Sequence, residues 1–434
     1  MAIVGLAFTL NAYAPRRRPT ALIGVSFFSA WLTTELAVFH LAWQAIAVVA
    51  FVAAGALRSW PGDLALALTV LSWAGLVRIV AISLRTGEVM HAALDEIGVP
   101  PDDAPKPTAF ESITRALHLS PRRPGVEKIK NLAYIDDDDR RHQLDIYRAK
   151  PAEFGDRAAP APVLLQIHGG GWMIGEKKQQ GLPLMYHLAQ RGWVCVAINY
   201  RLSPRATWPD HLVDCKQALA WIKRHIAEYG GDPQRIVVTG GSAGGHLTAM
   251  LGLTANDPRF QPGFEAVDTS VRAFVPIYAV YDFTDRIGIR GRRDPLRWML
   301  ERRIVKLLRD TNYEVFDLAS PMSHVRDGVP PCFVVHGALD TLAPVEEARE
   351  FVGLLRAAST APVAYAELPG THHAFDVFPS IRSILTVAGV ERFAEWAVNS
   401  PDRSGAARSA AGGDASAIDP TTTVHREPSP APRG

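Results

Sequence analysis

Residues 236–247 decide the fold; they read IVVTGGSAGGHL. They join a short β-branched run to a helix-length segment through small residues, and one serine stands at the junction. A serine at a sharp strand-to-helix turn needs small neighbours, because the backbone there is strained and packs closely. Glycines flank Ser242 on both sides. The pattern predicts a nucleophilic serine at a strand end, and an ordinary glycine-rich turn is the alternative that these residues alone leave open.

A second glycine loop lies upstream of Ser242. Residues 168–172, HGGGW, directly follow the apolar run Val163–Ile167. Glycine amides can approach a substrate closely and point at the oxygen that becomes negative during acyl transfer. The rival interpretation is a phosphate-binding loop, but the Lys-Ser/Thr ending of that motif is missing. The loop therefore predicts an oxyanion-binding site.

Two further strand-like runs end in a carboxylate and a histidine. Asp340 follows the run 332–335, and His373 follows the run 363–368. The chain order Ser242, Asp340, His373 is the order expected of α/β-hydrolases. The neighbouring His372 and Asp376 are weaker alternatives for the base and the acid.

Residues from about 121 to 400 alternate short apolar runs with helix-length segments. This alternation predicts an α/β fold with a doubly wound, mostly parallel sheet. Strands buried on both faces are apolar nearly throughout, as are 163–167, 194–198, 236–239, 273–278 and 332–335.

An antiparallel hairpin is expected at one edge of this sheet. The runs 132–135 and 143–147 flank a polar turn that contains Asp136–Asp139. These aspartates lack the glycine and the spaced ligands of a calcium-binding loop, so a solvated turn is favoured.

The combined motifs resemble the hormone-sensitive-lipase-type branch of the α/β-hydrolases. The resemblance rests on HGGG at 168–171, YRLSP at 200–204 and GGSAGG at 240–245. It implies a catalytic domain over residues 125–400 and a helical cap inserted at about 283–320. Two positions depart from the pattern: Gly241 stands where many members have Asp, and Arg205 stands where many have Glu.

The resemblance also implies roles for individual residues. The backbone amides of Gly170, Gly171 and Ala243 would form the oxyanion hole. His373 would accept the proton of the serine, and Asp340 would hold the imidazole in the useful tautomer.

The expected activity is that of a serine carboxylesterase or lipase, which acts on a small-molecule ester or a lipid through an acyl-enzyme. An amidase or formamidase with the same triad is one alternative. A non-catalytic ligand receptor on the same fold is another.

Residues 1–90 are predicted to form a membrane-spanning helical region. Residues 36–57 carry no formal charge, and residues 64–84 carry only Arg78, lengths that suit a hydrocarbon core of ~30 Å. The uncharged stretch 21–34 is shorter, so the expected count is two or three spans. These spans are expected to anchor a multi-pass protein in the cell membrane rather than to react.

Several features of the N-terminal region keep alternatives open. The count of spans decides the side of the catalytic domain, because the arginines at 16–18 should stay cytoplasmic. Residues 12–14, AYA, are similar to a signal-peptidase cleavage site, but no basic region precedes them, so a cleaved signal peptide is a weaker alternative. A buried helical hairpin of a soluble fold is the remaining alternative.

Three other segments complete the predicted organisation. Residues 91–124 are expected to be a linker or cap-associated segment, and residues 401–434 a disordered tail, because the tail has few large apolar residues. Residues 285–310 hold nine Lys/Arg among apolar residues. A solvated helix with an apolar inner side is favoured there over a surface that rests on anionic lipid.

Composition argues against several other classes of protein. The chain has 46 Lys+Arg and 44 Asp+Glu, a net charge of +2, which gives no electrostatic case for nucleic-acid binding. Cys195, Cys215 and Cys332 lie in apolar runs and suggest buried thiols rather than disulfides or zinc ligands. No motif indicates a cofactor or a metal. The oligomeric state, the acyl length and the alcohol group are left open by the sequence.

Overall fold

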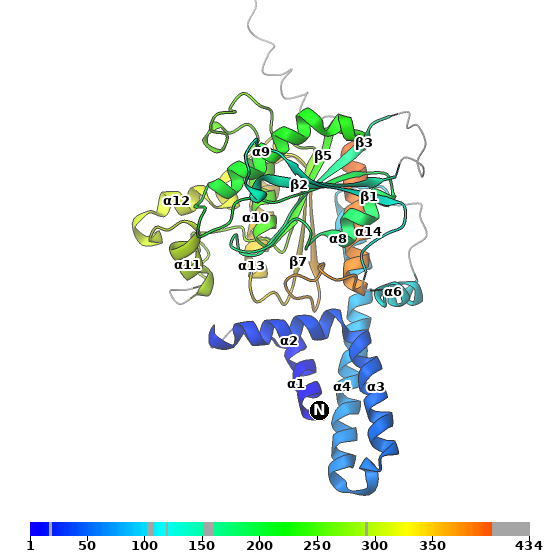
Figure 1. Cartoon of the computed structure of the whole chain (residues 1–434). Coiled ribbons are helices and arrows are strands. Elements are labelled where there is room, and N and C mark those ends of the chain that lie inside the picture. The colour runs from blue at the N-terminus through cyan, green and yellow to red at the C-terminus, as the bar shows by residue number, and fades with distance from the viewer. Residues whose placement is uncertain (17–19, 102–107, 119, 151–158, 291–293, 402–434) are drawn as a thin grey trace, which may run out of the picture. The chain divides into compact units, whose positions relative to one another are not determined.

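The central element is an eight-stranded sheet in the order β1-β2-β4-β3-β5-β6-β7-β8. The computed structural model describes residues 1–16, 20–101, 108–118, 120–150, 159–290 and 294–401. Strands β3 to β8 are parallel, whereas β2 is antiparallel to both of its neighbours, so the predicted fold class and edge hairpin are confirmed (Figure 1). The strands are β1 (Val126–Ala133), β2 (Gln143–Ala149), β3 (Ala161–Ile167), β4 (Val194–Ile198), β5 (Gly231–Gly241), β6 (Ala273–Ile277), β7 (Cys332–Gly337) and β8 (Val363–Leu368).

Helices cover both faces of the sheet, which explains why its strands are apolar on both sides. Every residue of β4, β6 and β7 is buried. One face packs against α9 (Asp210–His225), α10 (Ala243–Leu253) and α13 (Val345–Ala358). The other face packs against α5 (Thr86–Glu96), α8 (Leu182–Gln190) and α14 (Ile381–Asn399). The three cysteines are free and buried, as predicted.

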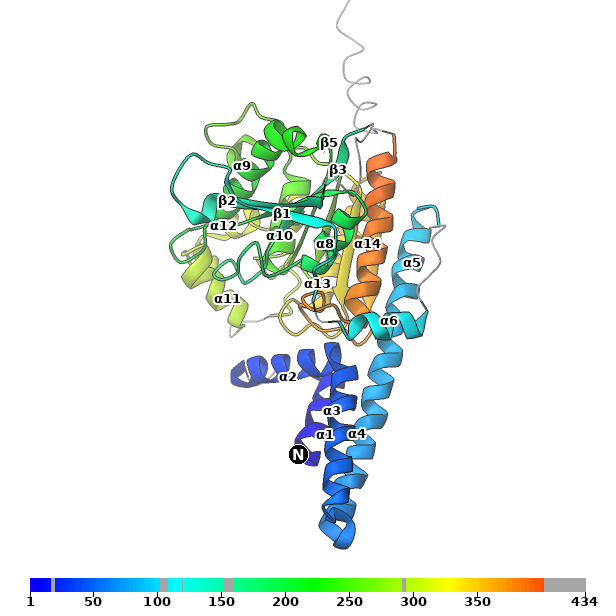
Figure 2. The ribbon, with the colours of Figure 1, turned by 45° about the vertical axis from the view of Figure 1, so that its right-hand side comes forward.

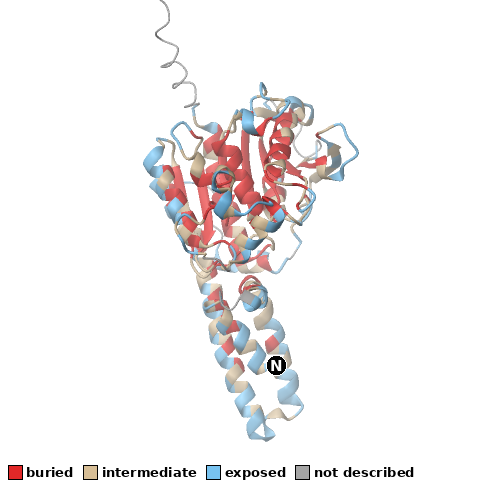
Figure 3. Cartoon of the chain, turned by 90° about the vertical axis from the view of Figure 1, so that its left-hand side faces the viewer, coloured by how far each residue is buried: buried red, intermediate tan, exposed pale blue. Residues whose placement is uncertain are grey.

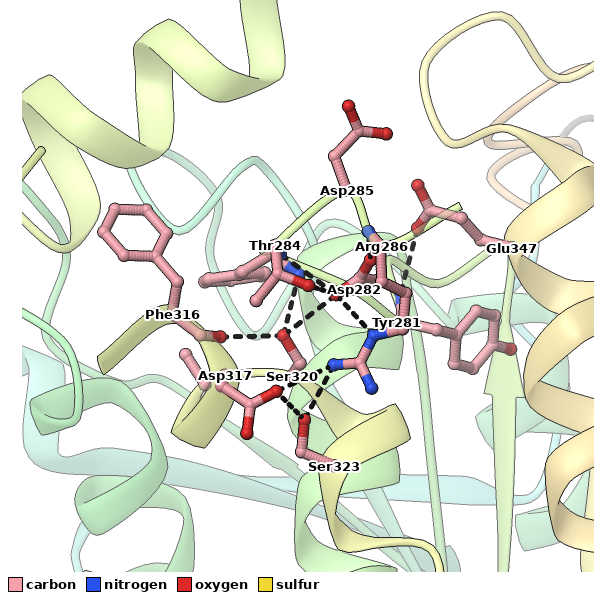
Figure 4. A network of polar contacts seen from close by, with 12 residues as sticks. Tyr281, Asp282, Thr284, Asp285, Arg286, Phe316, Asp317, Ser320, Ser323 and Glu347 are labelled. Carbon is pink, nitrogen blue, oxygen red and sulfur yellow. Dashed lines mark hydrogen bonds and ion pairs between the residues drawn. The ribbon is translucent and has the colours of Figure 1, made fainter. Parts of the chain in front are cut away.

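The segment between β6 and β7 contains short helices rather than one long helix. They are α11 (Pro295–Met299), a π-helical turn (Leu300–Ile304), α12 (Tyr313–Leu318) and the 3-10 turns Arg309–Thr311 and Pro321–His324. The buried carboxylate of Asp282, just after β6, accepts hydrogen bonds from Thr284, Arg286 and Ser320 (Figure 4). Arg286 also pairs with Asp317 at 3.1 Å. This network fastens the two ends of the segment to each other.

Most described basic residues of this segment have partners within the protein. Arg290 pairs with Glu347, and Arg297 pairs with Glu301 at 2.9 Å. Leu300, Ile304 and Val305 are buried in the core on the α9 face. The structure thus favours the solvated-helix interpretation of this segment over a surface for anionic lipid; residues 291–293 lie outside the described residues.

Among the described residues, the N-terminal region contains one helix that is long and apolar enough to cross a membrane. That helix runs over Trp60–Glu96, comprising α4 (Trp60–Leu84) and α5, and its most apolar window has a mean hydropathy of 2.0 with 22% of the residues buried. The other N-terminal helices are α1 (Ala2–Tyr13), α2 (Ile23–Glu35), α3 (Ala37–Ala53) and α6 (Ala109–Ala116). The bent pair α2 and α3 would count as a second span only if the two were one span. Figures 1 and 2 show α3 alongside α4.

The structure does not support a multi-pass arrangement. The predicted span over 36–57 breaks at both ends: α2 and α3 are bent by 84° at Leu36, and Gly55 adopts a left-handed conformation after α3. The 17 residues of α3 extend about 26 Å at ~1.5 Å per residue, less than a ~30 Å hydrocarbon core.

The segment 91–124, expected as a linker or cap-associated segment, is described except for residues 102–107 and 119. It contains the second half of α5, which packs on the sheet through Leu94, and the capped helix α6. Residues 17 and 18 of the arginine cluster and residues 402–434 of the predicted tail lie outside the described residues.

Candidate active site

Ser242 lies on the turn between β5 and α10, where the backbone is strained. Its φ of 59° and ψ of −123° belong to a region that few L-residues adopt. Gly240 and Gly244 flank it because the carbonyl of Ile167 lies where their side chains would be. The predicted elbow therefore exists and holds the serine at the end of a central strand.

The departure at Gly241 has a steric cause. A side chain at this position would collide with the ring and hydroxyl of Tyr278. Tyr278 lies just after β6, and its hydroxyl donates a hydrogen bond to Asp376. A tyrosine thus fills the space beside the serine that an aspartate would need.

Asp340 and His373 meet at the ends of β7 and β8. The Nδ1–H of His373 donates to Oδ2 of Asp340 at 2.7 Å, and the other carboxylate oxygen accepts the amides of Leu342 and Ala343 at 2.8 Å each. Burial alone would raise the pKa of Asp340, but the attraction and hydrogen bond of His373 hold that pKa below its ordinary value. An ionised Asp340 fixes the proton on Nδ1 and leaves Nε2 as the free acceptor of the ring.

The glycine loop after β3 lies beside Ser242. A side chain on Gly169 would come within 3.1 Å of the Cβ of Ser242. Gly170 has a φ of 116° and Gly171 a φ of 59°, values that favour glycine. Tyr200 donates to the carbonyl of His168 at 2.9 Å and so holds the start of the loop.

The three amides predicted for the oxyanion hole are available. Within the residues that the structure describes, the amides of Gly170, Gly171 and Ala243 have no hydrogen-bond partner in the protein. The amide of Gly169, in contrast, donates to Oε1 of Gln180 at 2.7 Å. Gly169 therefore shapes the loop, and the next two glycines can serve a ligand.

Sequence comparisons identify the family. A family model described as BD-FAE matches residues 144–355. The chain is 43% identical over 405 residues to the probable carboxylic ester hydrolase LipM of Mycobacterium tuberculosis, a match that covers 91% of each chain. It is 40% identical to esterase LipQ of the same organism, over 71% of this chain and 74% of LipQ. The chain belongs to the hormone-sensitive-lipase-type α/β-hydrolase esterases. It is a carboxylic ester hydrolase.

Solved structures agree with this assignment. The esterase Est2 of Thermogutta terrifontis superposes with a TM-score of 0.51 and 28% sequence identity, over 65% of this chain and 96% of Est2. A truncated carbohydrate esterase from gut microbiota, at 22% identity and a TM-score of 0.53, supports the fold alone.

The two alternative residues of the esterase have other partners. The ring of His372 donates from Nε2 to the carbonyl of Ala12 at 3.0 Å. Burial lowers the pKa of His372 to about 4. Asp376 accepts the hydroxyl of Tyr278, whose ring lies 4.7 Å from that of His373. The geometry therefore favours His373 and Asp340.

Ser242 and His373 open into a cavity of about 1450 Å³. Two parts of the chain supply most of its large apolar side chains, which are α2 (Ile23, Phe27, Phe28, Trp31) and the segment between β6 and β7 (Ile289, Leu296, Met299). The loops after β3, β7 and β8 add Trp172, Ile174, Leu342 and Val377. The part from α2 was not predicted from the sequence, because the stretch 21–34 is also uncharged enough for a span or an interfacial helix. The available signal was the four-residue spacing of Ile23, Phe27 and Trp31, but a spacing does not show which surface it faces.

No metal site accompanies the cavity in the described part of the chain. Among those residues, no three His, Cys, Asp or Glu side chains lie close enough together to hold a metal ion.

Proposed function

We propose that this esterase hydrolyses carboxylic esters through an acyl-enzyme formed on Ser242. The observation that carries the proposal is the 2.7 Å hydrogen bond from His373 to a buried Asp340, together with the opening of Ser242 and His373 into one cavity. A serine nucleophile, a histidine base and an orienting carboxylate form the arrangement that activates a hydroxyl near neutral pH.

The reaction proceeds in two halves. Nε2 of His373 accepts the proton of Ser242 as the hydroxyl oxygen attacks the ester carbonyl, and the amides of Gly170, Gly171 and Ala243 stabilise the oxyanion. The tetrahedral intermediate expels the alcohol, which takes the proton from His373. Water, deprotonated by the same nitrogen, then attacks the acyl-enzyme and releases the acid.

The decisive experiment is the Ser242→Ala variant. We expect it to lose hydrolysis of p-nitrophenyl butyrate by at least ~10³-fold and to lose labelling by a fluorophosphonate probe. Ser359→Ala, at the end of α13, is the matched control and should retain both. Labelling that persists in Ser242→Ala would overturn the proposal. Turnover of an ester and an amide with the same acyl group separates an esterase from the amidase alternative.

We further propose that α4 attaches the esterase to a membrane. Its 25 residues extend about 37 Å at ~1.5 Å per residue, and Val70, Leu71 and Val77 each expose more than half of their surface. Transfer of such apolar side chains from water into lipid is favourable.

Fractionation tests this attachment. The double variant Leu71→Arg, Val77→Arg should move the protein from carbonate-washed membranes to the soluble fraction, because each charge costs about 2.5–3.5 kcal/mol near a bilayer centre. Tyr313→Arg, a matched change on exposed α12, should leave the protein in the membrane fraction. Retention of the double variant in washed membranes would contradict the attachment by α4.

A further inference from the structure

Helix α2 presents one apolar face to the active-site cavity. Ile23, Phe27 and Trp31 are spaced by four residues, which places them on the same side of a helix, and all three line the cavity with Phe28. Phe27 is 7% exposed, and its ring centroid lies 6.3 Å from that of His373. A helix from the N-terminal region therefore stands directly beside the proposed base.

The indole of Trp31 ties α2 to the loop that carries His373. Its Nε1–H donates to the carbonyl of Ala374 at 2.9 Å, one residue beyond the histidine. The ring also stacks on Phe378, with 5.1 Å between the centroids. The helix and the loop thus share both a polar and an apolar contact.

A buried ion pair fastens the C-terminal end of α2. Glu35 pairs with Arg382 at 2.7 Å and accepts the hydroxyl of Ser380 at 2.6 Å. The side chains of Glu35 and Arg382 are each 1% exposed. Removing one partner of such a pair would leave an uncompensated buried charge, which is strongly destabilising. The position of α2 on the cavity is therefore strongly specified.

The size and lining of the cavity indicate its occupant. Its volume of about 1450 Å³ exceeds the ~300–1,000 Å³ of common small-molecule sites. Besides Ser242 and His373, the polar lining residues are Gln180, Tyr278, Arg290, Asp294, Thr341 and Glu346, and none of them belongs to α2. The α2 side is apolar throughout, so a polar acyl group there would lose hydrogen bonds to water without replacement.

Helix α2 also joins the cavity to the exposed apolar helices. Only Leu36 separates α2 from α3, on which Ile46 and Val49 are about 70% exposed. We propose that α2 is the acyl-selecting wall of the active site and that the preferred substrates are long-chain lipid esters, which reach Ser242 from the lipid phase. This inference rests on the proposed function and assigns α2 a direct part in catalysis beyond anchoring.

An acyl-chain series on the full-length esterase in detergent micelles tests the wall. The measured quantity is the ratio of kcat/KM for p-nitrophenyl dodecanoate to that for the butyrate. We expect Phe27→Asn and Phe28→Asn to lower this ratio at least ~10-fold, because an amide replaces apolar contacts of the longer chain. Phe28 is 56% exposed, so its variant keeps the test valid if Phe27→Asn fails to fold.

Val25→Asn is the matched control on α2. Val25 is 68% exposed and does not line the cavity, so the ratio should stay within ~2-fold of the original. If the ratio is unchanged in both phenylalanine variants, while the butyrate is hydrolysed in a Ser242-dependent manner, α2 is not the acyl wall. If hydrolysis does not depend on Ser242, the proposed function fails instead.

A second assay tests entry from lipid. A dodecanoyl ester embedded in phosphatidylcholine vesicles should be hydrolysed at least ~10-fold more slowly by Leu71→Arg, Val77→Arg, whereas soluble butyrate should be hydrolysed at the original rate. Equal loss with both substrates, or no loss with either, would overturn delivery from the lipid phase.

Discussion

Apolar side chains are buried in the sheet but largely exposed on the N-terminal helices. Every residue of β4, β6 and β7 is buried beneath helices, whereas Ile46, Leu71 and Val77 each expose more than half of their surface. Figure 3 shows the contrast as a buried sheet and largely exposed or half-exposed N-terminal helices.

This contrast shows the limit of hydropathy as a predictor. Hydropathy indicates that a segment avoids water, but it does not indicate whether protein, lipid or a ligand covers that segment. Flanking helices cover the strands from both sides. For α4 we propose lipid, and for one face of α2 the structure provides the active-site cavity. In these proposals the same kind of apolar residue serves a core, a membrane contact and a binding wall.

The largest expected effect should change catalysis without changing membrane attachment. Asp340→Asn should lower kcat by about 10⁴-fold, because the neutral amide no longer fixes the Nδ1–H tautomer of His373. Membrane fractionation of this variant should not change. Asp376→Asn is the matched control, since Asp376 bonds to Tyr278, and it should cost less than ~10-fold. A larger loss in Asp376→Asn than in Asp340→Asn would reverse the assignment of the acid.

A pair of truncations measures the contrast in burial directly. Phe274→Ala in β6 should reduce the free energy of unfolding by about 3–5 kcal/mol, because it opens a cavity in a fully packed core. Leu71→Ala should cost less than ~1 kcal/mol in detergent micelles, where the exposed side of α4 stays covered by detergent. Denaturant titrations of both variants in one detergent give the comparison. Equal losses would mean that α4 is packed against protein.

The sheet was predictable from the sequence for a physical reason. Strands buried on both faces must be apolar throughout, so β4 begins and ends at the residues that the sequence indicated. The region 36–57 satisfied the same hydropathy argument, yet a bend at Leu36 and a left-handed Gly55 interrupt it. Hydropathy averages over a window and does not locate a bend.

The predicted site residues lie together because parallel strands end at one edge of the sheet. Ser242, Asp340 and His373 each follow a strand. His373 bonds to Asp340 and lines one cavity together with Ser242. The contact between Glu35 and Arg382 was not predictable, because it joins residues 347 positions apart without any repeating pattern. The sequence around each of these two residues does not indicate which residue it contacts.

The glycine loop offers an intermediate effect. Gly170→Ala should lower kcat by about 10²–10³-fold, since the new side chain would collide with the carbonyl of Ile174 at a φ of 116° and displace an oxyanion amide. Gly353→Ala in α13 is the control, because a side chain there meets nothing within 4 Å. That variant should keep its activity and gain slightly in stability. Full activity in Gly170→Ala would remove this loop from the oxyanion hole.

The smallest effect concerns the contact of His372 with Ala12, which joins the catalytic loop to α1. Burial and the charge of Arg382 lower the pKa of His372 to about 4, below the ordinary value of 6.5. Between these two pH values the unfolded chain binds more protons than the folded chain, so stability falls as the pH falls through that window. His372→Gln keeps an N–H donor for Ala12 but cannot be protonated. Between pH 7.5 and pH 5, the free energy of unfolding should therefore fall by about 1–2 kcal/mol less in this variant than in the original protein.

Thermal unfolding at a series of pH values measures this difference in one detergent. Burial also lowers the pKa values of His168 and His211 to about 4, so both proteins should lose stability in acid. Only the difference in stability between the two proteins reports on His372. This difference should increase as the pH falls below 6.5 and become constant near pH 4. Parallel curves over that range would show that protonation of His372 does not contribute to the loss of stability in acid.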